Sequence, residues 1–181
     1  MSDFKYSIQL RFEKKTEDSI KMLIEHLRSK NLVNEKYINE NYTPHISLGV
    51  FKSMDECFGS KMINGISKDF SKLNLNLNSL GHFYKDLKVL YFSPTLTTEL
   101  RNIHLRMLKD LKGRPEENWD LYNLNNWIPH CAILIDDNNT KIIEALNFVF
   151  DFNIGDIQMD RIQLTGFKDK YIFELSNHNV N

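Results

Sequence analysis

The sequence contains few of the residues that build cross-linked or loop-rich proteins. Only two cysteines occur among 181 residues, Cys57 and Cys131, and they form neither a disulfide framework nor a metal-binding C-x-x-C spacing. Four prolines and seven glycines are too few for a disordered or low-complexity chain. We therefore expect a folded domain whose two thiols are buried, in a reducing compartment.

An excess of one charge and a long apolar run are also missing. The 23 basic and 24 acidic residues give a formal net charge of −1, which argues against binding long nucleic acid by bulk electrostatics. A small anionic ligand held by local groups stays compatible with this balance. No apolar run approaches the roughly 18 residues of a membrane span, and residues 1–12 lack the pattern of a secretion signal. The sequence predicts a cytoplasmic protein.

Hydrophobic periodicity predicts an α+β protein. Residues 4–12 alternate between apolar and polar side chains, as in a half-buried strand. A helical pattern follows, with Thr16 as the expected N-cap. The predicted strands are 4–12, 45–51, 73–83, 88–93, 130–135, 157–166 and 171–176, and the predicted helices are about 16–30, 54–66, 97–113 and 139–150.

The order strand, helix, strand, helix, hairpin occurs twice along the chain. Residues 80–93, "LGHFYKDLKVLYFS", align with residues 164–176, "LTGFKDKYIFELS". An internal duplication is the simplest explanation. We therefore expect one bilobal domain over residues 1–181, with pseudo-repeats of about 1–88 and 89–181. Its two antiparallel sheets should face a central groove with the helices outside, and an exchange of strands between the lobes stays open.

A Pro-His pair stands at the head of an apolar strand twice, in "NYTPHISLGVF" (41–51) and "NNWIPHCAILI" (125–135). Residues i and i+2 of a strand share a face. His45, Ser47 and Gly49 are thus expected opposite the apolar core face, as are His130, Ala132 and Leu134 in the second strand. If the two lobes are related by a pseudo-dyad, the two histidines face each other across the groove.

Two facing imidazoles suit paired proton transfer. Histidine titrates near neutral pH, so one ring can accept a proton while the other donates one. In-line displacement at a phosphodiester needs both, and the Ser47 hydroxyl can donate to a phosphoryl oxygen. Trp127, three residues before His130, is the best candidate for stacking on a nucleobase. The remaining histidines are expected to be structural or superficial: His26, His82, His104 and His178.

The segments "PHISL" and "PHCAI" resemble the paired H-x-[ST]-x motifs of the two-histidine (2H) phosphoesterase superfamily, which includes bacterial 2'-5' RNA ligases and cyclic nucleotide phosphodiesterases. The first segment matches fully, whereas the second has Ala132 in place of the hydroxyl residue. The resemblance implies the bilobal fold of that superfamily. It also implies that His45 and His130 form the acid–base pair, that Ser47 binds phosphate, and that residue 132 offers only its backbone or a vacated hydroxyl position.

The activity that the resemblance implies needs neither metal nor cofactor. It is the hydrolysis, or the reversible ligation, of 2',3'-cyclic phosphates or 2'-5' linkages in RNA or small nucleotides, by a monomer that does not bind membranes. Two alternatives stay open. Ala132 makes a non-catalytic or weakly active nucleotide- or RNA-binding protein plausible. A metal-dependent hydrolase with both histidines as ligands is the other, although no H-E-x-x-H segment or Asp/His cluster accompanies them.

Overall fold

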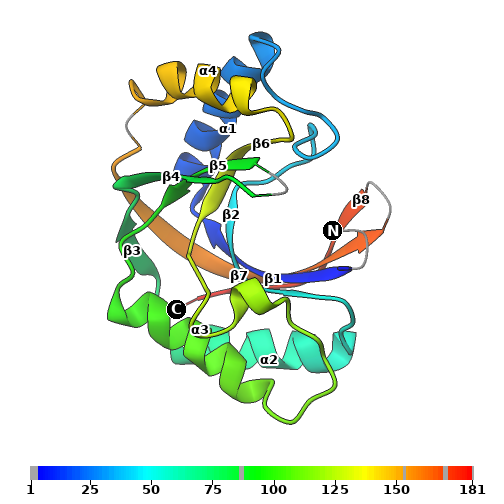
Figure 1. Cartoon of the computed structure of the whole chain (residues 1–181). Coiled ribbons are helices and arrows are strands. Elements are labelled where there is room, and N and C mark those ends of the chain that lie inside the picture. The colour runs from blue at the N-terminus through cyan, green and yellow to red at the C-terminus, as the bar shows by residue number, and fades with distance from the viewer. Residues whose placement is uncertain (1–3, 86–87, 153, 169–170, 181) are drawn as a thin grey trace.

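The computed structural model describes residues 4–85, 88–152, 154–168 and 171–180, and in these residues it contains two antiparallel sheets and four α-helices (Figure 1). The strands are β1 (Tyr6–Phe12), β2 (His45–Phe51), β3 (Leu73–Asn76), β4 (Ser79–Phe83), β5 (Lys88–Ser93), β6 (Cys131–Asp136), β7 (Asp156–Lys168) and β8 (Tyr171–Asn179). The helices are α1 (Lys14–Ser29), α2 (Glu56–Asp69), α3 (Thr98–Asp110) and α4 (Asn139–Val149), and a 3-10 turn covers Asp120–Tyr122. The predicted α+β class is confirmed.

Each sheet combines strands from both halves of the chain. The larger sheet has the order β2-β1-β7-β3, and β8 also pairs with β7; the smaller sheet has the order β4-β5-β6. The order β2-β1-β7 recurs as β6-β5-β4, with β5 in the place of β1 and β6 in the place of β2. In the smaller sheet β4 comes before its partner β5 in the sequence. In the larger sheet the equivalent strand, β7, comes from near the end of the chain and pairs with β1.

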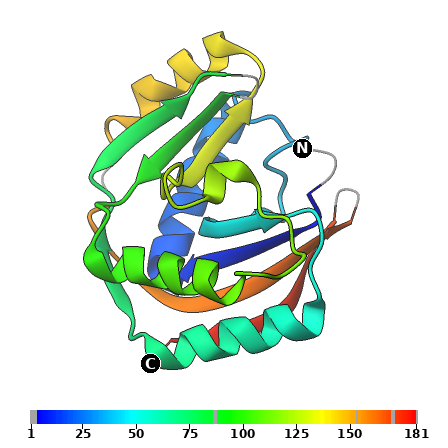
Figure 2. The same ribbon diagram turned by 60° about the horizontal axis from the view of Figure 1, so that its bottom comes forward.

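Two helices cover each sheet on its outer side. Helices α2 and α3 lie together along the larger sheet, and α1 and α4 lie along the smaller one (Figures 1 and 2). The apolar stripe predicted for α1 is buried, as Ile20, Leu23, Ile24 and Leu27 show. Burying such a stripe supplies most of the stability of a helix in a globular protein. The apolar residues of both layers form one continuous core.

The first strand is buried on both faces, which the alternation did not predict. Ile8 and Leu10 point into the core as expected, but the alternate residues Ser7, Gln9 and Arg11 are only 1, 3 and 8% exposed. Alternation identifies the apolar face of a strand, and it carries no information on whether a second sheet covers the polar face. The apolar face lies toward α2, where Gly59 meets Leu164, the partner of Ile8, so the polar face lies on the opposite side of the sheet.

Each Pro-His strand contains an irregularity at an equivalent position. The register between β1 and β2 skips Leu48, and the register between β5 and β6 skips Ile133. Both lie three residues after the histidine. An extra residue in one strand reverses the alternation beyond it, so the expected grouping of Gly49 and Leu134 with the histidines is wrong. Leu134 instead pairs with Leu90, and both are fully buried.

Four further expectations from the sequence are wrong. Helix α1 begins at Lys14 and has Glu13 as its N-cap, because the chain enters it directly from β1, so Thr16 lies inside the first turn. Cys57 is exposed in the first turn of α2, while Cys131 is buried as expected. Helix α3 ends at Asp110 rather than Gly113. Finally, residues 73–83 form two strands, β3 and β4, which belong to different sheets.

Gly81 in β4 allows the ring of Tyr91 to lie flat on the smaller sheet. A Cβ atom at residue 81 would come within 2.3 to 2.5 Å of three atoms of the Tyr91 side chain. The same ring packs against Phe83 with a centroid distance of 4.3 Å. A side chain at position 81 would therefore displace an aromatic ring that is part of the packed layer between the sheets.

We predict that Gly81→Ala lowers the free energy of unfolding by about 1–3 kcal/mol, the usual cost of overpacking. Chemical denaturation of the purified variant measures this change. The double variant Gly81→Ala/Tyr91→Ala removes the clashing ring, so the alanine at position 81 should cost much less in that background. Equal costs in both backgrounds would show that the contact with Tyr91 is not the reason for glycine.

Candidate active site

The structure brings the two Pro-His segments together at the point where the sheets meet. The Tyr42 hydroxyl, three residues before His45, donates a hydrogen bond of 2.8 Å to the carbonyl of Ala132. The Cys131 side chain also lies against the backbone of His45. The two imidazoles are close enough that the charge of His130 contributes to lowering the pKa of His45. Residues 85 positions apart in sequence are thus neighbours.

Both imidazoles are held by the same hydrogen bond. Nδ1 of His45 lies 2.7 Å from the carbonyl oxygen of Thr43, and Nδ1 of His130 lies 2.7 Å from that of Ile128. A carbonyl oxygen only accepts, so each Nδ1 carries the proton. In the neutral ring, Nε2 is then the atom with the free lone pair. Each ring is partly exposed, so Nε2 is the nitrogen available for proton transfer in both.

The surroundings of the two rings differ in charge. Burial lowers the pKa of His45 from 6.5 to about 4, and the positive charges of Arg11 and His130 add to this effect. Arg11 is the residue opposite His45 in the pairing of β1 with β2. Burial also lowers the pKa of His130, and the bond to Ile128 opposes this shift, but no arginine contributes. The His130 ring instead packs against Phe83 and Tyr91, at centroid distances of 4.9 and 5.2 Å.

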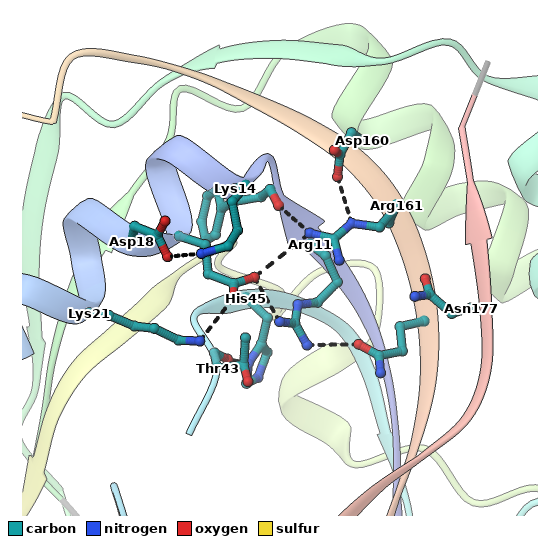
Figure 3. A network of polar contacts seen from close by, with 12 residues as sticks. Arg11, Lys14, Asp18, Lys21, Thr43, His45, Asp160, Arg161 and Asn177 are labelled. Atoms are coloured by element: carbon teal, nitrogen blue, oxygen red, sulfur yellow. Dashed lines mark hydrogen bonds and ion pairs between the residues drawn. The ribbon is translucent and has the colours of Figure 1, made fainter. Parts of the chain in front are cut away.

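A network of ion pairs holds Arg11 beside His45 (Figure 3). Arg11 donates through Nη1 to Gln163 at 2.7 Å and through Nη2 to Glu17 at 3.0 Å. Glu17 also pairs with Lys21 at 2.9 Å and lies 3.7 Å from Arg161. Burial would raise the pKa of Glu17, but the hydrogen bonds from Lys21 and Arg11 outweigh it and lower the pKa. No local pattern in the sequence indicates this network, since its members lie on three separate elements.

Ser47 is held from several sides. It is 9% exposed, and its hydroxyl oxygen lies 3.4 Å from that of Ser7. Burial raises the pKa of Tyr122 to about 12, and a hydrogen bond with the Ser47 side chain partly offsets this rise. Ala132 occupies the equivalent position of β6, two residues after His130, and offers no hydroxyl.

Trp127 packs between the strand of Ser47 and His104 of α3. Its indole N–H donates to the Ser47 carbonyl at 2.9 Å, and its ring stacks on His104 with a centroid distance of 3.9 Å. His104 Nε2 in turn lies 2.9 Å from the carbonyl oxygen of Tyr122. One face of the indole is therefore covered by protein. The predicted stacking of Trp127 on a nucleobase stays a prediction. His104 has a structural role, as expected, because it stacks on the indole that hydrogen-bonds to the strand of Ser47.

The connection before the second Pro-His strand runs along the edge of β2. Trp119 donates its backbone N–H to Val50 at 2.7 Å, and the Asn118 side chain accepts from the backbone N–H of Val50 at 3.1 Å. These bonds fix residues 118 and 119 to the strand of His45. The connection thus follows the C-terminal end of β2, and it reaches the site through Tyr122, which hydrogen-bonds with the Ser47 side chain.

Two surface hollows lie away from the histidines. One, of about 420 Å³, is lined by Glu25, Arg28, Glu35, Asn39 and Glu40, and the other, of about 640 Å³, lies beside β3. Among the described residues, no three or more His, Cys, Asp or Glu side chains are grouped so that they could hold a metal ion. No helix in the described ranges is long and apolar enough to cross a membrane.

The charge of Arg11 beside His45 gives a testable pH dependence. The folded chain binds a proton at His45 less tightly than the unfolded chain, because the pKa falls from 6.5 to about 4. This contribution to stability is fully present above pH 6.5 and is lost as the pH falls toward 4. In NMR titrations we expect a His45 midpoint near pH 4, and a higher midpoint in Arg11→Gln. Arg101→Gln, which removes an exposed arginine of α3, is the control; a wild-type midpoint at or above 6.5 would contradict the expectation.

Solved structures similar to this chain include a protein described as a phosphoesterase and E. coli LigT. One described as a phosphoesterase superposes with a TM-score of 0.64 at 11% identity, covering 98% of both chains. E. coli LigT with 3'-AMP gives a TM-score of 0.63 at 11% identity over 98% of both chains, and E. coli LigT with phosphate gives 0.58 at 11% over 98% of this chain and 97% of LigT. No family model and no curated protein sequence matches. The fold implied by the resemblance is confirmed, because this chain shares its fold with E. coli LigT and with a protein described as a phosphoesterase.

Proposed function

We propose that this protein is a metal-independent phosphoesterase that acts on 2',3'-cyclic phosphates or 2'-5' linkages of RNA or small nucleotides. The observation that carries the proposal is the matched pair of imidazoles. Each is fixed through Nδ1 to a backbone carbonyl two residues earlier, and each keeps Nε2 for proton transfer. The fold shared with LigT, a protein solved with 3'-AMP and with phosphate, supports the same class of substrate.

Hydrolysis of a 2',3'-cyclic phosphate would use the two rings in turn. Nε2 of one neutral imidazole takes a proton from water as the water oxygen bonds to phosphorus. The bond from phosphorus to the 2' or 3' oxygen breaks, and the other imidazole, protonated at Nε2, gives its proton to that oxygen. The products are a phosphomonoester and a free hydroxyl. In ligation a 5' hydroxyl takes the place of water and the two rings keep these roles. Acid and base exchange roles only in the reverse step, which cleaves the 2'-5' linkage back to a cyclic phosphate.

The surroundings of the rings favour one assignment for hydrolysis. His45 faces the fixed charge of Arg11 and is neutral at pH 7, which suits the base. His130 faces aromatic rings and no arginine, so it is the better candidate for the acid. A phosphate anion between the rings would favour protonation of either imidazole. Ser47, two residues after the base, would donate to a phosphoryl oxygen.

Ala132 favours a second candidate function. A hydrogen bond to a charged group contributes roughly 1.5–3 kcal/mol, so the missing hydroxyl weakens phosphate binding by one to two powers of ten. A site weakened in this way could retain nucleotide or RNA binding with little or no turnover. The chain would then be a binding protein of the same fold, in which the histidines contact the ligand without transferring protons.

Single histidine variants separate the two functions. We expect His45→Ala and His130→Ala each to lower kcat for a 2',3'-cyclic nucleotide by about 10² to 10⁴, the usual contribution of a general acid or base. Nucleotide binding should fall much less. His82→Ala, which removes an exposed histidine of β4, is the matched control and should keep full activity.

The outcomes are distinct. Wild-type protein that binds nucleotides but turns over neither a cyclic phosphate nor a 2'-5' linkage would leave only the binding function. Activity abolished by EDTA and restored by a divalent metal would instead revive a metal-dependent mechanism.

Restoring the hydroxyl of the second motif tests the role of residue 132. We expect Ala132→Ser to bind inorganic phosphate about tenfold more tightly, because the new hydroxyl can donate to a phosphoryl oxygen. Isothermal titration measures the affinity, and Ala132→Val is the control for a change of size without a donor. Unchanged affinity in the serine variant would mean that another group already supplies this contact.

A further inference from the structure

The inner face of the larger sheet is polar across three strands. Ser7, Gln9 and Arg11 of β1 lie side by side with Ser47 and His45 of β2 and with Thr165, Gln163 and Arg161 of β7, because paired residues of antiparallel strands share a face. This face points away from α2, whose Gly59 instead meets Leu164 on the apolar side. Gln9 stands at its centre, paired with Ser47 on one side and with Gln163 on the other.

The polar side chains next to Gln9 already have hydrogen-bond partners of their own. Gln163 accepts from Arg11 at 2.7 Å and donates to Glu174 at 2.6 Å. Arg11 also donates to Glu17 at 3.0 Å. The Gln9 side chain, only 3% exposed, makes no hydrogen bond with any residue that the structure describes, and its amide is not among the fully enclosed polar groups. Its N–H donors are therefore free for a ligand.

Gln9 lies where an additional hydrogen-bond donor for phosphate could act, next to Ser47. Its partner Ser47 is the proposed phosphate ligand, and Cβ atoms of such pairs lie about 4.5–5.5 Å apart. The glutamine side chain is longer than serine, so it extends further from the sheet. Its NH₂ group provides two donors. Arg11, two residues further along β1 on the same face, places a positive charge next to Gln9, which favours an anion there.

We propose that the Gln9 amide donates a hydrogen bond to a phosphoryl oxygen of the substrate, in addition to the contact from Ser47. The proposal rests on the phosphoesterase function proposed above. It assigns a substrate contact to β1, a strand outside both Pro-His segments. Recognition of the phosphate would then come from Ser47 and Gln9 in adjacent strands of one sheet, rather than from one hydroxyl in each sheet.

The substitution Gln9→Leu tests this role, because it should lower phosphate affinity without lowering the stability of the fold. It replaces an amide without a partner by an apolar group of similar size, so we expect a melting temperature equal to or above that of the wild type. Affinity for inorganic phosphate and kcat/KM for a 2',3'-cyclic nucleotide should each fall about tenfold. Gln9→Glu keeps the size but adds a carboxylate that repels phosphate, so its affinity should be lower still.

Gln158→Leu is the matched control. It alters a glutamine of the same sheet that bonds to Asn74 across β3, away from the histidines. It should keep phosphate affinity and turnover. A Gln9→Leu protein that binds phosphate within twofold of the wild type, or a Gln9→Glu protein that binds it equally well, overturns the proposal. A marked loss of stability in Gln9→Leu does so too, since it would reveal a structural partner for the amide.

The same measurements separate this inference from the function on which it rests. If the wild type binds phosphate, loses that binding in Gln9→Leu and turns over no substrate, the catalytic function fails and the Gln9 contact stands. If the wild type turns over a cyclic nucleotide and Gln9→Leu does so equally well, only the Gln9 contact fails. A wild type that neither binds phosphate nor turns over substrate overturns both.

Discussion

The contact between the first residues of β2 and β6 is the constraint on which the site depends. These two strands belong to different sheets, and the hydrogen bond from Tyr42 to Ala132 joins them where each begins. The proline before each histidine fixes φ and removes a backbone donor, so the chain can turn at this point without leaving an N–H unpaired. The carbonyl two residues before each histidine is then available to its Nδ1. Placing the strand ends together thus also orients both rings.

The two halves of the site share a backbone plan but differ in chemistry. Both strands carry a histidine at the start and an irregularity three residues later. The difference comes from the neighbouring strand: β1 places Arg11 opposite His45, whereas β5 and β4 place Tyr91 and Phe83 beside His130. A cation disfavours a second positive charge, and an aromatic surrounding does so only through burial. Acid–base catalysis needs this kind of inequality, because one ring must be neutral while the other is charged.

The sequence predicts most of the elements and singles out the two Pro-His segments, because both depend on local patterns. Helical stripes such as Ile20, Leu23, Ile24 and Leu27 identify their element and its buried face. The two Pro-His pairs can be recognised because this rare dipeptide occurs twice, each time before an apolar strand. What could not be predicted depends on which strands become neighbours. Arg11 and Gln9 alternate like exposed strand residues, and only the second sheet makes them buried. The irregularities at Leu48 and Ile133, and the stacking of His104 on Trp127, likewise arise from contacts between distant segments.

The polar inner face is costly for the fold, and this cost argues that it serves a ligand. Among the described residues, the Arg11 Nε and the Thr165 hydroxyl are enclosed without a hydrogen-bond partner. Apolar residues at these positions would remove the desolvation cost, as they do on the other side of the same strands, where Ile8, Leu10 and Ile162 are fully or almost fully buried. Groups that cost stability and lie together persist where function needs them. Here they lie next to Ser47 and His45. An anion held between the sheets would accept hydrogen bonds from donors that have no acceptor within the protein.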